Sequence, residues 1–127
     1  MRATRVLSVG DLHCGNISGL TPDKFNPDSP EGHMMYLYRK KLYHWVQRKI
    51  EELRPIDICI VNGDAIDGKG EKSGGNEQIT TDRTVQIAMA IEFCKWVHAK
   101  EYHFSYGSNY HVGKEEDWEK CVASEFN

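Results

Sequence analysis

The 127-residue sequence lacks a long hydrophobic run, a closely spaced cysteine pair and any large excess of charge of one sign. Its longest unbroken apolar runs, such as residues 34–38, are five residues, against the roughly 20 that a membrane-spanning helix needs. The N-terminal segment has no long apolar stretch followed by a cleavage site, which disfavours a secreted protein. With 16 Lys and Arg against 19 Asp and Glu, the net charge of −3 provides no global positive field for nucleic acid.

The four cysteines are too far apart in sequence to form a two-residue-spaced pair, which disfavours a zinc ribbon or a thioredoxin-like motif. Cys59 lies in the apolar run 56–61, and Cys94 follows Phe93. Both thiols are therefore expected to be small core residues. Free thiols are typical of a reducing compartment, so we expect a cytoplasmic protein.

Hydrophobic periodicity divides the chain into alternating strands and helices. Apolar residues recur every three or four positions over 34–53, as on one face of a helix, and the pattern stops before Pro55. The almost uniformly apolar segment 56–61 predicts a strand covered on both faces. The full prediction is strands over 5–10, 56–61 and 101–106, with helices over 34–53, 81–99 and 115–126. This order predicts one α/β domain over residues 1–127, a parallel β-sheet with flanking helices.

Oxygen and imidazole ligands follow each predicted strand, in segments 11–15, 62–68 and 107–111. Taken singly, Asp11 is a turn or cap residue and His13 an ordinary surface histidine. The carboxyl ends of parallel strands meet at one edge of a sheet, so we expect these side chains to gather there. Two carboxylates and an imidazole converging without a cation would be poorly solvated, and the coincidence favours a site for Mn, Fe, Zn or Mg.

At these positions the chain resembles the calcineurin-like metallophosphoesterases, whose signature is Asp-x-His, Gly-Asp-x-x-Asp and Gly-Asn-His. Residues 11–13 and 63–67 match the first two motifs closely. The third motif departs, because Asn109 and His111 stand two residues apart rather than adjacent. The resemblance covers roughly residues 5–113 and implies the first half of that family's α/β/β/α sandwich.

The resemblance implies hydrolysis of a phosphoester substrate, a monoester or a diester, by hydroxide formed at two divalent metal ions. Asp11 and His13 would bind the first ion, Asp64 would bridge both, and Asn109 is a candidate ligand of the second. His111 would be the catalytic acid that protonates the leaving oxygen. Asp67 is not a ligand in the family pattern and would instead orient the loop or the metal ligands.

Part of the family's site is missing from the sequence, because the family has later histidines and none follows His111. We therefore expect the amino-terminal half of such an enzyme, a truncated hydrolase. The alternative is an inactive remnant that binds metal weakly or binds a partner chain. A three-stranded sheet with an open edge and an uncovered face predicts a chain that is marginally stable, oligomeric or dependent on a complementing chain.

Two other functions fit parts of the sequence. Residues 63–70 nearly match a nucleotide-binding P-loop, but Gly70 replaces the Ser or Thr that holds magnesium, and two acidic residues would face phosphate. A phosphatase or a nuclease is equally compatible with the family.

The cations of the predicted helix over 34–53 are expected to form a solvated face rather than a nucleic-acid site: Arg39, Lys40, Lys41, Arg48 and Lys49. The aromatic side chains of the same segment could form a partner surface, but at helical spacing they are expected in the core: Tyr36, Tyr38, Tyr43 and Trp45.

Overall fold

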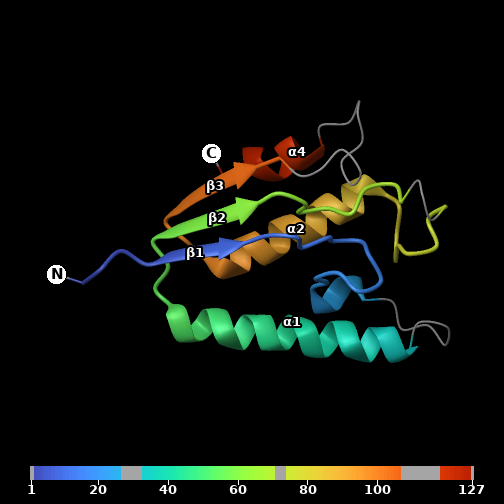
Figure 1. Cartoon of the computed structure of the whole chain (residues 1–127), viewed down its shortest axis with the longest axis horizontal. Helices are drawn as coiled ribbons and strands as arrows, with labels where there is room; N and C mark the ends of the chain where they lie inside the picture. The colour runs from blue at the N-terminus through green and yellow to red at the C-terminus, as the bar shows by residue number, and fades with distance from the viewer. Residues whose placement is uncertain (1, 27–32, 71–73, 107–117, 127) are drawn as a thin grey trace.

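A computed structural model describes residues 2–26, 33–70, 74–106 and 118–126, and the structural statements below concern these residues. Three parallel strands form one sheet in the order β1 (Val6–Val9), β2 (Ile58–Asn62) and β3 (Glu101–Ser105). The helices are η1 (Asp23–Phe25), α1 (His33–Leu53), α2 (Arg83–Val97) and α4 (Trp118–Ser124). In Figure 1, α2 lies behind the sheet and α1 runs beneath its β1 edge. The predicted α/β class with a parallel sheet is confirmed.

The helix boundaries follow from local chemistry at their ends. The Asp82 side chain accepts a hydrogen bond of 2.9 Å from the Thr84 N–H and caps α2 there, two residues later than the pattern predicted. His98 takes a left-handed conformation (φ 59°), which ends the same helix. Helix α1 stops before Pro55, as predicted. None of the helices in the described ranges is both long enough and apolar enough to span a membrane.

The hydrophobic core lies between the inner face of the sheet and the helices. Strand register places Leu7, Cys59 and Tyr102 side by side on this face. Phe93 and Val97 on α2 are fully buried in the same core. Cys59 and Cys94 are also fully buried, which confirms their predicted place in the core, and all four cysteines are free thiols.

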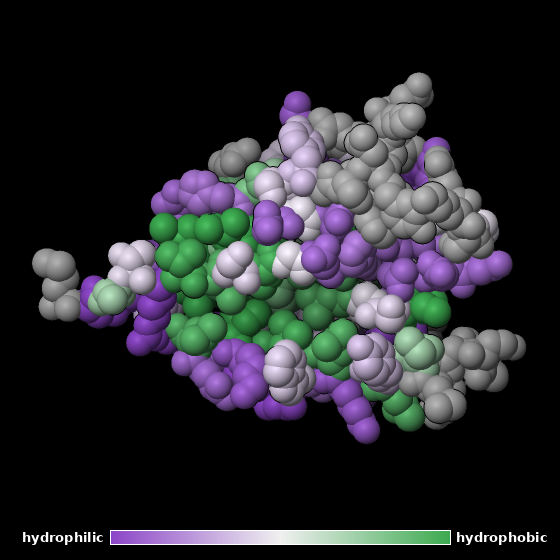
Figure 2. Space-filling model, in the orientation of Figure 1, coloured by the Kyte–Doolittle hydropathy of each residue, from purple (hydrophilic) through white to green (hydrophobic). Residues whose placement is uncertain are grey.

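The opposite face of the sheet is not covered by any described element, and the prediction that residues 56–61 form a strand covered on both faces is wrong. Ile58 and Ile60 point to this outer face and are only half-buried, and Val6 is 54% exposed. The physical reason is topological. Two successive right-handed crossovers that advance in the same direction put their helices on the same face. Val6, Ile58 and Ile60, the outward apolar side chains of β1 and β2, are here called the open face and form an apolar area visible in Figure 2. The outward side chains of β3 are polar: Glu101, His103 and Ser105.

We predict that the open face drives self-association, because exposed contiguous apolar surface is rare in monomeric proteins. Replacing Val6 with Lys is expected to shift the chain towards monomer, as measured by size-exclusion chromatography with light scattering over a range of concentrations. Leu37→Lys is the matched control, because Leu37 is 45% exposed but lies on α1. A wild-type chain that stays monomeric at every concentration would contradict this prediction.

Candidate metal centre

The loops that follow β1 and β2 continue side by side beyond the ends of the strands. Four backbone hydrogen bonds join them: Asp11 N–H to Gly63 O (3.2 Å), His13 N–H to Asp64 O (2.9 Å), Cys14 N–H to Ala65 O (3.1 Å) and Asp67 N–H to Cys14 O (3.0 Å). The parallel pairing of the two strands is thereby extended into the loops. Backbone hydrogen bonds alone therefore fix the two sequence motifs relative to each other.

Three residues on these loops have a left-handed backbone: Asp11 (φ 53°), His13 (φ 46°) and Asp64 (φ 51°). Positive φ is uncommon for residues other than glycine, and such strained residues gather at functional sites. Packing around the first loop is tight as well. A Cβ atom added at Gly19 would lie only 2.1 Å from the carbonyl oxygen of His13, so only glycine fits there. The surrounding structure therefore imposes this conformation on the two loops.

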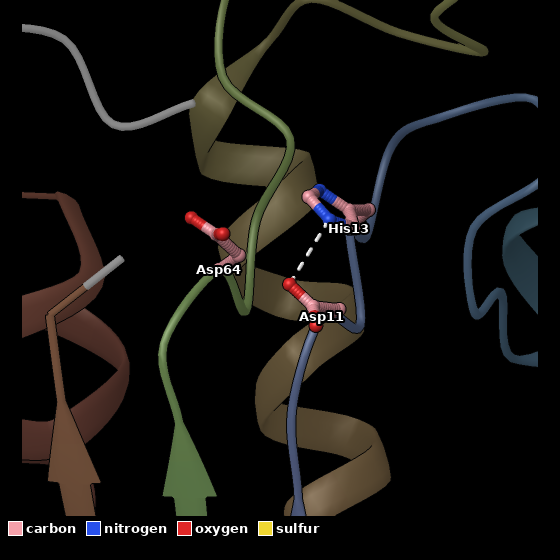
Figure 3. Close-up of side chains that lie close together, drawn as sticks. All are labelled: Asp11, His13 and Asp64. Atoms are coloured by element: carbon pink, nitrogen blue, oxygen red, sulfur yellow. Dashed lines mark ion pairs between the residues drawn. The ribbon is translucent and has the colours of Figure 1, made fainter. Parts of the chain in front are cut away.

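The same three residues bring their side chains together (Figure 3). One carboxylate oxygen each from Asp11 and Asp64 and one ring nitrogen of His13 all lie within 4.8 Å of one another. His13 Nε2 is 3.5 Å from Asp11 Oδ1. Within the described parts of the chain, no other group of three His, Cys, Asp or Glu residues meets this criterion. The Asp11 side chain is 78% exposed, so the cluster opens to solvent on one side.

Asp67 lies behind the cluster and holds His13 in place. Its buried carboxylate is 3.1 Å from His13 Nδ1, and it accepts hydrogen bonds from Asn16 Nδ2 (3.0 Å) and Gln78 Nε2 (2.5 Å). When Nδ1 donates its proton to Asp67, Nε2 presents a lone pair towards Asp11. This is the usual support for a metal-binding histidine, in which the second ring nitrogen fixes the tautomer.

The pKa values of this pair shift in opposite directions. The hydrogen bond to Asp67 raises the pKa of His13 against the opposing effect of burial, and the charges of Asp67, Asp64 and Asp11 add to the increase. Burial acts to raise the pKa of Asp67, but hydrogen bonds from His13, Gln78 and Asn16 outweigh it, and the pKa is lowered. The cluster thus stabilises positive charge at its centre. A set of two carboxylates and one imidazole fits one divalent cation with coordination positions left open.

Gln86 is a supporting residue that the sequence patterns did not reveal. It is fully buried in α2, its Nε2 donates to the carbonyl oxygens of Gly68 and Thr80, and its Oε1 accepts from the Gly68 N–H, each at 2.9 Å. Its side chain also fills the space that a Cβ at Gly15 would occupy. Gln86 therefore contacts both loops. The available signal was a polar residue on an otherwise apolar helix face, whose buried members are Gln86, Met89, Ala90, Phe93, Cys94 and Val97.

Glu119 on α4 is a second supporting residue that sequence analysis missed. It is 5% exposed, and its Oε1 accepts a hydrogen bond of 2.9 Å from the N–H of Ala65, the residue after Asp64. No motif pointed to it, because the contact joins residues 54 positions apart. Its effect is to hold the peptide that carries Asp64.

The structure brings four of the six predicted site residues into one place. Asp11, His13 and Asp64 form the cluster, and Asp67 contacts His13. Asn109 and His111 lie outside the described residues. The P-loop alternative lacks its helix, because the first helix after Gly70 in the described ranges starts at Arg83.

Comparison of the chain with protein-family models, curated proteins and solved structures finds no match. We therefore infer function from the chemistry and geometry of the residues described above.

We predict that Gln86→Leu destabilises the fold and loosens the cluster. The variant keeps most of the side-chain volume but leaves the N–H and carbonyl groups of Gly68 unpaired, at about 1–3 kcal/mol for each buried polar group. Urea denaturation measures the loss, and Gln47→Leu is the control, because Gln47 lies on α1 and is only half-buried. Equal unfolding free energies for Gln86→Leu and the wild type would show that this contact does not hold the loops.

Proposed function

We propose that the chain is a metal-dependent phosphoesterase domain, in which Asp11, His13 and Asp64 hold one divalent cation. The observation that carries the proposal is the convergence of these three side chains within 4.8 Å, each on a left-handed residue. Backbone strain at all three positions of a small cluster favours a functional role over a chance meeting of polar groups. Mn, Fe, Zn and Mg are all compatible with the donor set.

Each residue of the proposed site has a distinct task. His13 binds through Nε2, while Asp67 keeps its Nδ1 proton and ring orientation. Asp11 lies at the open side, where a phosphoester would approach. Bound divalent cations supply Lewis-acid activation of the phosphoryl oxygen and a hydroxide nucleophile near neutral pH. A second divalent ion would be held by Asp64 together with Asn109, and His111 would supply the proton for the leaving oxygen.

A catalytically inactive, partner-binding domain is the second candidate, and the open face favours it. Val6, Ile58 and Ile60 give the sheet an apolar outer surface that a second protein layer would cover. A complementing chain or a second copy of this chain would supply that layer. We also propose a cytoplasmic location, for which the four free cysteines are the supporting observation.

We predict that Asp64→Asn abolishes both Mn²⁺ binding, measured by titration calorimetry, and Mn²⁺-stimulated hydrolysis of bis-(p-nitrophenyl) phosphate. Asp67→Asn is expected to lower metal affinity by about 10- to 100-fold, because it removes the support of a metal-binding histidine. Asp23→Asn is the control, since Asp23 is an exposed carboxylate that pairs with His44.

The two candidates give different results in this experiment. Metal binding without turnover by any of the four metals would favour the inactive domain. Mn²⁺ bound by Asp64→Asn as tightly as by the wild type would refute the proposed centre.

A further inference from the structure

Helix α1 concentrates positive charge in a chain that is acidic overall. Residues 33–50 contain five Lys and Arg and no Asp or Glu, whereas the whole chain has a net charge of −3. One of the five, Arg39, is buried, contrary to the expectation that it forms part of a solvated helix face. Its Nε donates to Asn26 Oδ1 (2.6 Å) and its Nη1 to the carbonyl oxygen of Ile17 (2.8 Å). The other four are exposed: Lys40, Lys41, Arg48 and Lys49.

Two aromatic side chains accompany these cations. Tyr38 is 50% and Trp45 is 51% exposed, which corrects the expectation that they belong to the core, whereas Tyr43 is buried as expected. Tyr38, Lys41, Trp45 and Arg48 are separated by three, four and three residues and therefore share one helix face. With Leu42 and His44 they line one open depression, here called the α1 groove. The ammonium group of Lys49 lies 6.0 Å from the centre of the Trp45 ring.

We propose that the α1 groove binds single-stranded nucleic acid. Tyr38 and Trp45 stand two helical turns apart, about 10 Å along the axis, and each offers a ring on which a base can stack. Along the helix, Lys41 lies between the two rings and Arg48 lies beyond Trp45, and both can contact phosphates. Interleaved cations and aromatic rings are the pattern of a single-strand binding surface, which needs no base-specific hydrogen bonds.

The arrangement favours nucleic acid over a membrane surface. A helix that lies on a membrane keeps its cations on one face and buries the opposite, apolar face in lipid. In α1 the cations and the exposed rings share a face, and the opposite face, with Tyr43 and Ile50, is already buried in the protein core. The proposal does not rest on the metal centre, because none of the groove residues belongs to it.

The test is binding of a fluorescently labelled oligodeoxythymidylate, measured by anisotropy at several salt concentrations with EDTA present. Removing two phosphate contacts in Lys41→Gln/Arg48→Gln is expected to reduce the slope of log K against log salt by about 1.4, at about 0.7 per contact. Lys40→Gln is the matched control, since Lys40 is the neighbouring exposed cation but does not line the groove. It should leave the slope within error of the wild-type value.

The stacking part of the proposal has its own variant. Trp45→Leu is expected to weaken binding by about tenfold with the salt slope unchanged, and Trp45→Phe to restore most of the affinity. Circular dichroism checks that the exposed substitutions leave α1 folded. Asp64→Asn should bind the oligonucleotide like the wild type, so failure of the metal centre and failure of the α1 groove are distinguishable.

Three outcomes would overturn the proposal. The first is no oligonucleotide binding at low salt. The second is an equal effect of Lys40→Gln and of Lys41→Gln made as a single variant, which would indicate diffuse electrostatic attraction. The third is binding to vesicles of phosphatidylserine and phosphatidylcholine, lost in Trp45→Leu, without binding to the oligonucleotide.

Discussion

The candidate centre depends on the pairing of two loops, residues 11–14 and 63–67, beyond the ends of adjacent parallel strands. Backbone hydrogen bonds between these loops place the carboxylates and the imidazole of the cluster at fixed positions. They also hold three non-glycine residues in the left-handed region, a conformation that isolated loops would not keep. Buried groups from elsewhere in the chain secure the arrangement, Gln86 against Gly68 and Glu119 against Ala65. The cluster is therefore a property of the tertiary structure and not of either motif alone.

The same strand order explains the shape of the rest of the molecule. Successive neighbours connected by right-handed crossovers place the core on one face of the sheet and leave the open face without a described cover. Helix α1 packs through Tyr43 and Ile50, which leaves Tyr38 and Trp45 exposed among cations. Two surfaces of different character are thus left uncovered by the described elements. One is apolar, over β1 and β2, and the other is basic and aromatic, along α1.

Much of this architecture could be predicted from the sequence, because periodicity and glycine positions are local signals. The order of strands and helices, the core cysteines and the convergence of Asp11, His13 and Asp64 all follow from such signals. The burial of Arg39 and the contacts of Gln86 and Glu119 could not be predicted. Each depends on which distant backbone groups need a hydrogen-bond partner. The apolar composition of β2 suggested two covered faces, since composition reports hydrophobicity but not whether a second layer exists.

The most direct test of the account is anomalous diffraction from crystals of the chain grown with Mn²⁺. The account predicts a manganese peak within coordination distance of Asp11, His13 Nε2 and Asp64, with Asp67 retained on His13 Nδ1. A map in which these side chains carry no peak at saturating Mn²⁺, or in which manganese binds elsewhere, would contradict the central claim.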